Sequence, residues 1–386
     1  MLDHYDVLIV GGGPVGAALA LALQGSGLCV GLIEARADMV CDDPRALALA
    51  WGSVEGLTAL GVWQDVSEPT AIESVHVSQQ GALGRVRITH SEMGLPALGY
   101  VVSFGRLQTA LQQRLLTSDS DYRTGVTLQS LKTLAHYALA SVVEDGVQRD
   151  VTARLLVLAD GGRAVGRLTG IQHYSEPYRQ HAIIADVWAD RPHGGIAYER
   201  FSQAGPIALL PKESGFALVW TQPEHLAPQV LQWDDSTFLT RLQQAFGWRA
   251  GQLVKVGRRT GFPLQLRQLS NNVVQRVALI GNAAQSLHPV AGQGFNLGLR
   301  DALDLAAIIC SQPGRRLGDA SMLQQFSVRR RRDANLTVGF TDLLIHVFDQ
   351  HPAWLQHLRS AGLLALDMLP GARKALAGRM IYGSRG

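Results

Sequence analysis

The chain has 386 residues, 47% of them hydrophobic and 17% charged, which is the composition of a globular protein rather than a disordered one. Its length favours two connected domains over a single core. The formal net charge of +3 at pH 7 is too small to indicate nucleic acid as a partner. The 3 cysteines lack the spacing of metal ligands and leave one thiol unpaired, so we expect reduced thiols and no metal site.

The first residues, MLDHYDVLIVGGG, begin a strand pattern and lack the basic start, long apolar core and cleavage site of a signal peptide. No uninterrupted apolar run reaches the ~18 residues that span a bilayer. We therefore expect a cytoplasmic protein, with peripheral contact to the inner membrane as an open alternative.

Four short apolar runs predict the buried strands of a parallel sheet, because such strands are apolar on both faces where helices cover both sides. The runs lie at residues 7–10, 30–33, 155–158 and 277–280. Between the first two, a helix is expected to begin at Pro14 and to end near Gly25. The N-terminal segment is therefore predicted to form a β-α-β unit.

The middle of the chain has a different pattern, in which polar and apolar residues alternate, as in HAIIADVWAD and GFALVWTQ. Period-two alternation is typical of antiparallel strands with one solvated or ligand-facing side. We expect such a sheet at about 73–97 and 181–265, inserted between segments of the first domain. After about residue 300 the pattern is helical, and the run Arg329–Arg332 is interpreted as a solvated helix face.

The first motif with a chemical meaning is GGGPVG at residues 11–16, which follows the first strand and opens the helix. In the G-x-G-x-x-G pattern, Gly11 permits a tight turn, Gly13 lets a pyrophosphate approach the backbone and Gly16 lets the helix pack on the sheet. Glu34 ends the next strand, where it can accept hydrogen bonds from an adenosine ribose. The unit is predicted to bind a dinucleotide.

Two further motifs follow predicted strands. Asp160 and Gly161 come directly after the run at 155–158, although such a pair alone is usually a turn. The third motif is GNAAQSLHPVAGQGFN at residues 281–296, which joins a strand to a helix. Backbone N–H groups point outward at a helix start, where anionic or electron-rich ligands bind.

Taken in order, the three motifs resemble the aromatic-hydroxylase group of FAD-dependent monooxygenases over nearly the whole chain. The resemblance implies an α/β fold like that of p-hydroxybenzoate hydroxylase, with a Rossmann-like FAD-binding domain, an inserted antiparallel-sheet substrate domain and a C-terminal helical region. The implied boundaries are 1–72, 98–180 and 266–330 for the discontinuous FAD-binding domain, 73–97 and 181–265 for the substrate domain, and 331–386 for the C-terminal helical region.

The same resemblance implies which residues bind FAD. They are Gly11, Gly13, Pro14, Gly16, Glu34, Arg45, Asp160, Gly161, Asn282, Pro289, Gly292, Gly294, Phe295 and Asn296. Backbone N–H groups around 294–297 are expected to hold the flavin pyrimidine oxygen. Asn282 stands where most of the family has an aspartate; its amide still bonds a ribityl hydroxyl but carries no charge.

Several stretches, among them ALAWGSVEGLTALGVW and AYERFSQAGPIALLP, are more narrowly similar to the ubiquinone-biosynthesis hydroxylases, most of all to the 2-octaprenyl-6-methoxyphenol hydroxylases. This similarity implies ring hydroxylation of a prenylated phenol, 2-polyprenyl-6-methoxyphenol. NAD(P)H would be the co-substrate and O2 the oxidant, through a C4a-hydroperoxyflavin. It also leaves open a peripheral membrane contact or a contact with a ubiquinone-biosynthesis complex.

A phenol is a better nucleophile as the phenolate, so a nearby base would help the reaction. His288 lies within the third motif, and Tyr198 and Glu199 lie on a predicted ligand-facing strand. Each is more often structural, so catalysis is assigned mainly to the cofactor. Two alternatives stay open, namely an FAD hydroxylase of a small soluble phenol and a non-catalytic flavoprotein subunit of a biosynthetic complex.

Overall fold

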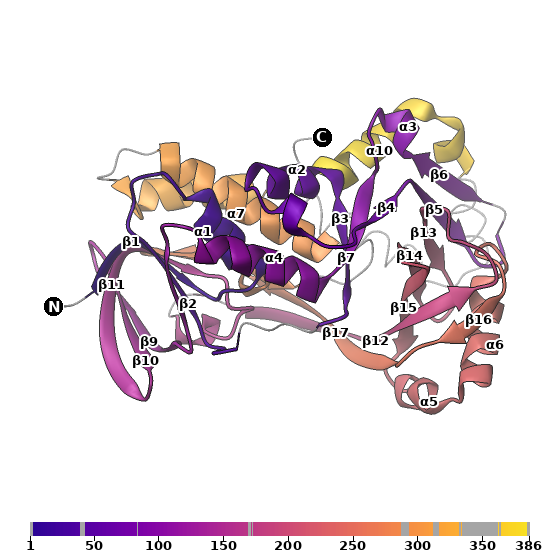
Figure 1. Cartoon of the computed structure of the whole chain (residues 1–386), viewed down its shortest axis with the longest axis horizontal. Helices are drawn as coiled ribbons and strands as arrows, with labels where there is room; N and C mark the ends of the chain where they lie inside the picture. Colours follow the sequence, from indigo (N-terminus) through magenta and orange to yellow (C-terminus); the bar gives the residue numbers. More distant parts are fainter. Residues whose placement is uncertain are drawn as a thin grey trace.

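The structure, a computed structural model, describes residues 3–38, 43–82, 84–168, 171, 173–286, 293–311, 316–331, 333, 362 and 364–383. Two large sheets lie at opposite ends of an elongated molecule, and a three-stranded sheet lies between them (Figure 1). Most of the long helices run along one side. The predicted combination of a sheet with a parallel core and an antiparallel sheet is therefore confirmed.

The first sheet is built on a parallel core. Its strand order is β18 (Val273–Val274), β19 (Val277–Leu279), β11 (Val147–Leu158), β1 (Asp3–Val10), β2 (Val30–Glu34) and β8 (Asp121–Thr124). All neighbours in this order pair in parallel except the short β18. The four predicted apolar runs are all strands of this sheet, although β19 ends one residue earlier than expected.

The two faces of this sheet are covered in different ways. Helices α1 (Pro14–Ala22), α4 (Phe104–Leu116) and α7 (Gln293–Ser311) cover one face, where their leucines share a core with Ile9. The other face packs on β9 (Thr127–Thr133) and β10 (Ala138–Glu144), so the expectation of helices on both sides is wrong. The reason lies in β11, whose first half extends beyond β1 and pairs with β10.

The small sheet and the short helices connect the two large sheets. The small sheet has the order β3 (Ala46–Ala50), β7 (Gly99–Ser103) and β4 (Thr70–Ile72). The short helices around the two halves are α2 (Trp51–Ala59), α3 (His90–Met93), η1 (Trp63–Asp65), η2 (Val165–Arg167) and η3 (Gly281–Ala283).

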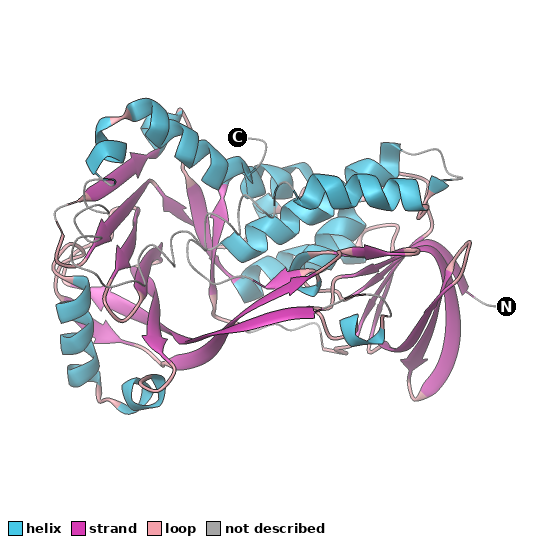
Figure 2. Cartoon of the chain, turned by 180° about the vertical axis from the view of Figure 1, so that it is seen from behind, coloured by secondary structure: helices cyan, strands magenta, loops and turns pink. Residues whose placement is uncertain are grey.

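The second large sheet is almost entirely antiparallel. Its order is β20 (Gln285–Ser286), β17 (Thr260–Leu269), β12 (His173–Ala189), β15 (Gly215–Pro223), β14 (Pro206–Lys212), β13 (Ile196–Phe201), β5 (Ser74–Gln79) and β6 (Arg85–Thr89), with β16 (Leu253–Val256) beside β12. Only β13 and β5 pair in parallel. Figure 2 shows β12 and β17 as a long ribbon that reaches from this sheet toward the first one. Helices α5 (Ala227–Gln232) and α6 (Asp235–Phe246) cover its outer face.

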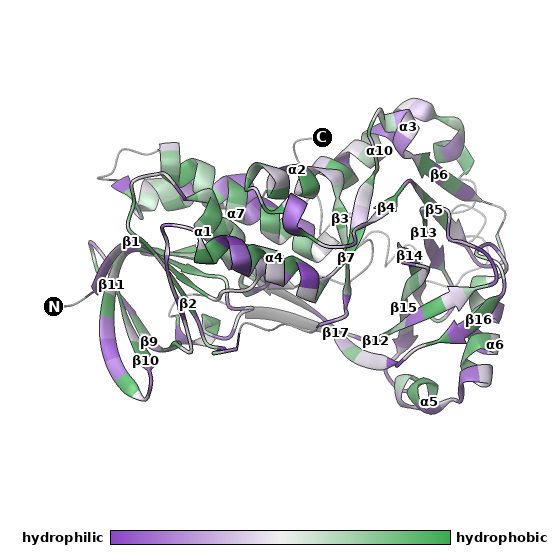
Figure 3. Ribbon diagram, viewed as in Figure 1, coloured by the Kyte–Doolittle hydropathy of each residue, from purple (hydrophilic) through white to green (hydrophobic). Residues whose placement is uncertain are grey.

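The C-terminal helix α10 (Pro370–Tyr382) packs against α2 and α3. Ala377 and Ile381 are buried in a cluster with residues of the second sheet, so this part of the tail belongs to the core. Figure 3 shows how hydrophobic residues gather on the inward sides of the helices and strands. No helix among the described residues combines the length and apolar character that crossing a membrane requires.

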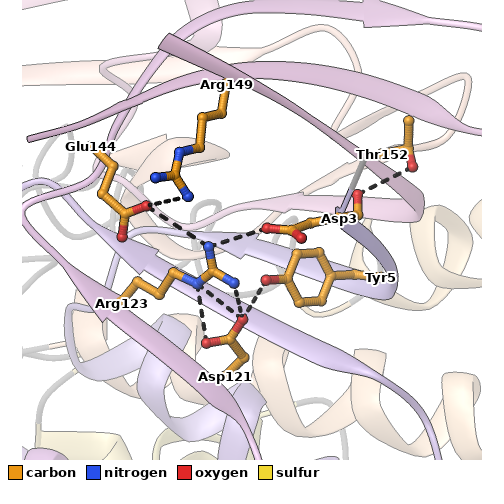
Figure 4. A network of polar contacts seen from close by, with 7 residues as sticks. All are labelled: Asp3, Tyr5, Asp121, Arg123, Glu144, Arg149 and Thr152. Carbon is orange, nitrogen blue, oxygen red and sulfur yellow. Dashed lines mark hydrogen bonds and ion pairs between the residues drawn. The ribbon is translucent and has the colours of Figure 1, made fainter. Parts of the chain in front are cut away.

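A polar network fastens the outer edge of the first sheet (Figure 4). The Tyr5 hydroxyl on β1 donates to Asp121 on β8, and the Arg123 guanidinium donates to the same carboxylate at 2.7 Å. Burial, followed by the hydrogen bond and charge of Asp121, raises the pKa of Tyr5. To reach β8 the tyrosine ring crosses Gly31 on β2, where an added Cβ would lie 2.7 Å from the ring. The network therefore depends on the absence of a side chain at Gly31.

We predict that Gly31→Ala destabilises the protein by ~1–3 kcal/mol, the usual cost of forcing an extra carbon into a packed site. Chemical denaturation measures the change in the free energy of unfolding. Gly371→Ala is the matched control, because a Cβ at that helical glycine meets no described atom within 4 Å. Combined with Tyr5→Ala, the Gly31→Ala substitution should cost less than it does alone, since the ring it strikes is gone. Equal costs in both backgrounds would contradict the proposed steric contact.

Candidate active site

One large cavity lies between the two large sheets. Its volume is about 1530 Å³, and residues from both sheets, α10 and the small sheet line it. Pockets for a single drug-sized ligand usually measure ~300–1,000 Å³. The cavity therefore has room for a large cofactor together with a second molecule.

The glycine-rich loop enters the cavity at the end of β1. Gly11 has a φ of +109°, and an added Cβ would lie 2.7 Å from the backbone of Asp160, at the end of β11. At Gly16 an added Cβ would strike the carbonyl oxygen of Gly11, so α1 can sit directly on the loop only with a glycine there. These two close approaches hold the start of α1 at the mouth of the sheet.

Gly13 differs from its neighbours because the space beside it is open. An added Cβ there would meet no described atom within 4 Å. Gly13 is the N-cap of α1 and Pro14 is its first residue, and no side chain of the described chain caps this helix. The exposed N–H groups and the positive end of the helix dipole favour an anionic group. The loop thus fits a pyrophosphate.

Glu34 lies at the end of β2, beside this loop. Its Oε2 accepts a hydrogen bond from the Gly12 amide at 2.7 Å, and its Oε1 accepts one from the Arg36 amide at 3.0 Å. A carboxylate has about four acceptor positions, so two remain for hydroxyl donors of a ribose. Glu34 also lines the cavity, as its predicted role requires.

Asp160 shapes the turn that follows β11. Its carboxylate accepts from the amides of Gly162 at 3.0 Å and Ala164 at 2.7 Å. Gly161 and Gly162 both have positive φ angles, which a glycine adopts without strain. Asp160 and Gly161 line the cavity. The side chain thus fixes the backbone that faces a ligand.

Asn282 lies on η3, exposed and on the cavity wall. The adjacent Gly281 amide donates to Asp301 on α7 at 3.0 Å, and Asp301 forms a buried ion pair with Arg330 at 3.0 Å. Burial raises the pKa of Asp301 to about 6. Arg330 is only 6% exposed, so the prediction of a solvated face for the whole arginine run is wrong. The ion pair instead supports the loop that carries Asn282.

The start of α7 brings Gly294, Phe295 and Asn296 to the cavity. The Asn296 side chain is directed into the protein: its Oδ1 accepts from the Ala50 amide at 2.9 Å and the Ser53 hydroxyl at 2.7 Å. This residue therefore ties α7 to the β3–α2 junction through its side chain. The predicted residues His288, Pro289 and Gly292 lie outside the described part of the chain.

Arg45 lines the cavity between its two halves. Its guanidinium pairs with Asp43 at 2.6 Å and lies 5.2 Å from the centre of the Phe104 ring and 5.9 Å from that of Phe262. Burial alone would raise the pKa of Asp43, but the hydrogen bonds and charge of Arg45 outweigh it and lower that pKa. Phe262 belongs to β17, so Arg45 joins the two domains.

Tyr198 on β13 is among the residues that line the cavity, but its side chain packs beneath α6. Its ring contacts Phe246 edge-on at 5.6 Å, and its hydroxyl donates to the Arg249 carbonyl oxygen at 3.2 Å. Burial raises its pKa. These contacts give Tyr198 a packing role in the core under α6.

Gln108 on α4 was not anticipated from the sequence. Its Nε2 donates to the Gly12 carbonyl oxygen at 2.8 Å, and its Oε1 is buried without a hydrogen-bond partner in the described structure. Gln112, one turn later, also lines the cavity. The feature of the sequence that could have indicated this role is a pair of glutamines four residues apart, which lie among the apolar residues on the buried face of the helix. An unpartnered amide oxygen beside the glycine loop fits a ligand that supplies a donor.

Comparisons with known proteins agree with this site. The family model described as "FAD binding domain" matches residues 4–341. The chain is 32% identical to the ubiquinone hydroxylase UbiL of Rhodospirillum rubrum, over 98% of this chain and 90% of the relative. It is 31% identical to the 3-demethoxyubiquinol 3-hydroxylase of Escherichia coli, over 94% of each chain.

Among solved structures, p-nitrophenol 4-monooxygenase PnpA from Pseudomonas putida superposes with a TM-score of 0.81 and covers 100% of both chains at 16% identity. This likeness confirms the predicted p-hydroxybenzoate-hydroxylase-like α/β fold. The chain therefore belongs to the FAD-binding monooxygenase family, in the branch of the ubiquinone-biosynthesis hydroxylases, and it is an FAD-dependent aromatic monooxygenase.

Proposed function

We propose that the protein hydroxylates the ring of a prenylated phenol, 2-polyprenyl-6-methoxyphenol, on the path to ubiquinone, with NAD(P)H as co-substrate. The observation that carries this proposal is the apolar wall of the cavity's second half. The residues of this wall include Val75, Val77, Val86, Ile88, Ile184, Ala208, Leu210, Val219, Phe262, Leu264 and Met380. The names of the two bacterial relatives support the same pathway.

The apolar wall suits both parts of such a substrate. Each CH2 group moved from water to an apolar surface contributes ~0.8 kcal/mol to binding. A prenyl chain can therefore bind through the apolar surface that it buries, without hydrogen bonds. The same surface keeps water from the ring, which protects a reactive oxygen donor. When bound, FAD supplies that donor from O2 after reduction by NAD(P)H.

The polar half of the cavity would hold the cofactor. Gly13 and the first turn of α1 would bind the pyrophosphate, Glu34 would accept from the adenosine ribose, and Asn282 would bond a ribityl hydroxyl. The backbone of Gly294 and Phe295 would face the ring. Arg45 would lie at the boundary between cofactor and substrate.

The first test of this assignment is FAD binding. Gly13→Asp should abolish it, because the added carboxylate would occupy the open space where the pyrophosphate is expected. Flavin absorbance after gel filtration and calorimetric titration with FAD measure occupancy. Gly371→Asp is the control, since that glycine is also open but lies on α10. Glu34→Ala should weaken binding by ~1–3 kcal/mol. Full occupancy in Gly13→Asp would refute the placement.

The second test is the substrate. The purified holoenzyme should oxidise NADPH faster when 2-polyprenyl-6-methoxyphenol is added, and mass spectrometry should find a product heavier by one oxygen. Removal of the protein from its host should lower ubiquinone. Turnover of small water-soluble phenols only, with normal ubiquinone, would support the alternative hydroxylase. Absence of turnover with any phenol would support a non-catalytic subunit.

A prenylated substrate must be taken from a membrane or from a carrier, and the segment before α10 is our candidate contact. Met368 is 79% exposed and Leu369 is 58% exposed, with Lys374 one turn into the basic helix α10. We predict that Met368→Ser with Leu369→Ser weakens sedimentation with anionic lipid vesicles and leaves FAD content unchanged. Val147→Ser, at an apolar residue 54% exposed on the far sheet, is the control. Equal sedimentation of all three proteins would exclude this contact.

A further inference from the structure

Glu199 is the residue of the cavity wall that the assignments above leave unused. Alternation along β13 places it on the face opposite Tyr198, and it lines the cavity. The residues paired with it on the neighbouring strands are Ala208 on β14 and Val77 on β5, and both are apolar. A carboxylate therefore stands in the middle of an apolar wall.

The charges of this wall are few. Of the described residues that line the substrate half, only Asp186, Glu199 and Arg258 carry charge. Asp186 is already paired, since Lys212 donates to its two oxygens at 2.9 and 3.0 Å. No described residue donates a hydrogen bond to Glu199, and burial, without a contribution from any neighbouring charge, raises its pKa to about 7.

The titratable groups on the other face of β13 do not account for this property. His76 on β5 contacts the Tyr198 ring at 5.7 Å, and burial followed by nearby arginines lowers its pKa to about 4. The Arg200 guanidinium is directed to the Ala245 carbonyl oxygen at 3.2 Å. Both groups lie on the face of the sheet opposite Glu199, so among the described residues of β5 and β13 Glu199 is the titratable group on the cavity side.

The Glu199 side chain is half-buried in this wall, and a carboxylate withdrawn from water without a partner is costly. Replacement by an apolar residue would remove that cost without breaking any hydrogen bond or ion pair of the side chain in the described structure. What an unpartnered carboxylate offers is a free acceptor for a donor on the ligand. A phenol is such a donor, and Glu199 is the one carboxylate among the described residues of strands β5, β13 and β14.

We propose that Glu199 is the general base of the hydroxylation and accepts the proton of the substrate's phenol. This inference rests on the proposed function, because it requires a phenolic substrate. As the ring carbon forms its bond to the hydroxyl oxygen that the bound cofactor would supply, the bond between this oxygen and its donor breaks and the donor keeps the electron pair. The phenol proton passes to a Glu199 oxygen, and the phenol oxygen becomes a carbonyl. The ring then loses its C–H proton to solvent, solvent returns a proton to the reduced donor, and Glu199 returns the first proton to the carbonyl oxygen. Glu199 thus ends as it began.

The acidity of the two groups fits these roles. A phenol has a pKa of ~10, as in tyrosine, so it is neutral when it binds. A base is most effective when its own pKa is close to the working pH, which is the case for Glu199. Because the base must be ionised, the rate should rise with pH through about 7.

The test compares the holoenzyme with Glu199→Gln, which keeps the shape of the side chain and removes the base. We expect kcat/KM for the prenylated phenol to fall about 10²- to 10⁴-fold, the usual range for general-base catalysis, with FAD content unchanged. The rise of rate through pH 7 should disappear, and Glu199→Asp should retain part of it. Phenols made more acidic by ring substituents should recover more activity in the variant than in the wild type. Glu224→Gln, at an exposed glutamate, is the control.

A stability measurement separates this role from a structural one. The pKa of Glu199 is raised in the folded state, so its ionisation costs the folded protein stability as the pH rises from about 4.5 to 7. Glu199→Gln should therefore raise the Tm, and the gain should grow from about pH 5 to about pH 8. A lower Tm in the variant, or an unchanged pH profile of the rate, would overturn the proposal. If the wild type hydroxylates no phenol, the proposed function fails, whereas the Tm comparison still reports on the ionisation of Glu199.

Discussion

The close approach of β1 and β11 at Gly11 is the constraint on which the site depends. Parallel strands bring their carboxyl ends to one edge of a sheet. The turns that follow β1 and β11 lie side by side at this edge, and their backbones can touch only if one residue there lacks a side chain. Gly11 provides this, since a Cβ would lie 2.7 Å from Asp160. With the two turns in contact, α1 begins at the cavity and its first amide groups face into it. A bulkier residue at Gly11 would move the helix start away from the ligand.

The cavity joins two chemically different surfaces. The half beside the first sheet includes backbone amides and two carboxylates, those of Glu34 and Asp160, that accept hydrogen bonds from the backbone. The backbone N–H groups that donate to these two carboxylates reduce their repulsion of a nearby pyrophosphate. Arg36, Arg163 and Arg167 line the same half and add positive charge, and Arg45 lies at its boundary with the other half. The other half is apolar, so a polar cofactor and an apolar substrate are each bound by the surface that suits them.

The sequence was sufficient for the features that depend on local pattern. Buried strands, the glycine loop and the alternating strands each follow from neighbouring residues, and the structure confirms them as elements. The features that were missed join residues far apart in the chain. Asn296 bonds residues about 246 positions away, and Arg330 reaches back to Asp301 from a run that looked solvated. The residue pattern of neither segment indicates its partner, because the partner depends on how α7 packs against segments that are distant in the chain.

Glu199 is a second case in which the sequence pattern alone was not sufficient. Alternation on β13 placed it on a ligand-facing strand beside Tyr198, but the pattern alone did not distinguish the two residues. The difference is in what surrounds them: Tyr198 contacts Phe246 and a carbonyl oxygen, while Glu199 faces a cavity lined by apolar strands. Burial without a partner raises the pKa of Glu199 to about 7 and makes its ionised form a cost to the fold. In return for this loss of stability, the site has a hydrogen-bond acceptor whose pKa is close to neutral pH. A ligand that donates a hydrogen bond to Glu199 would stabilise the ionised form and so offset the loss.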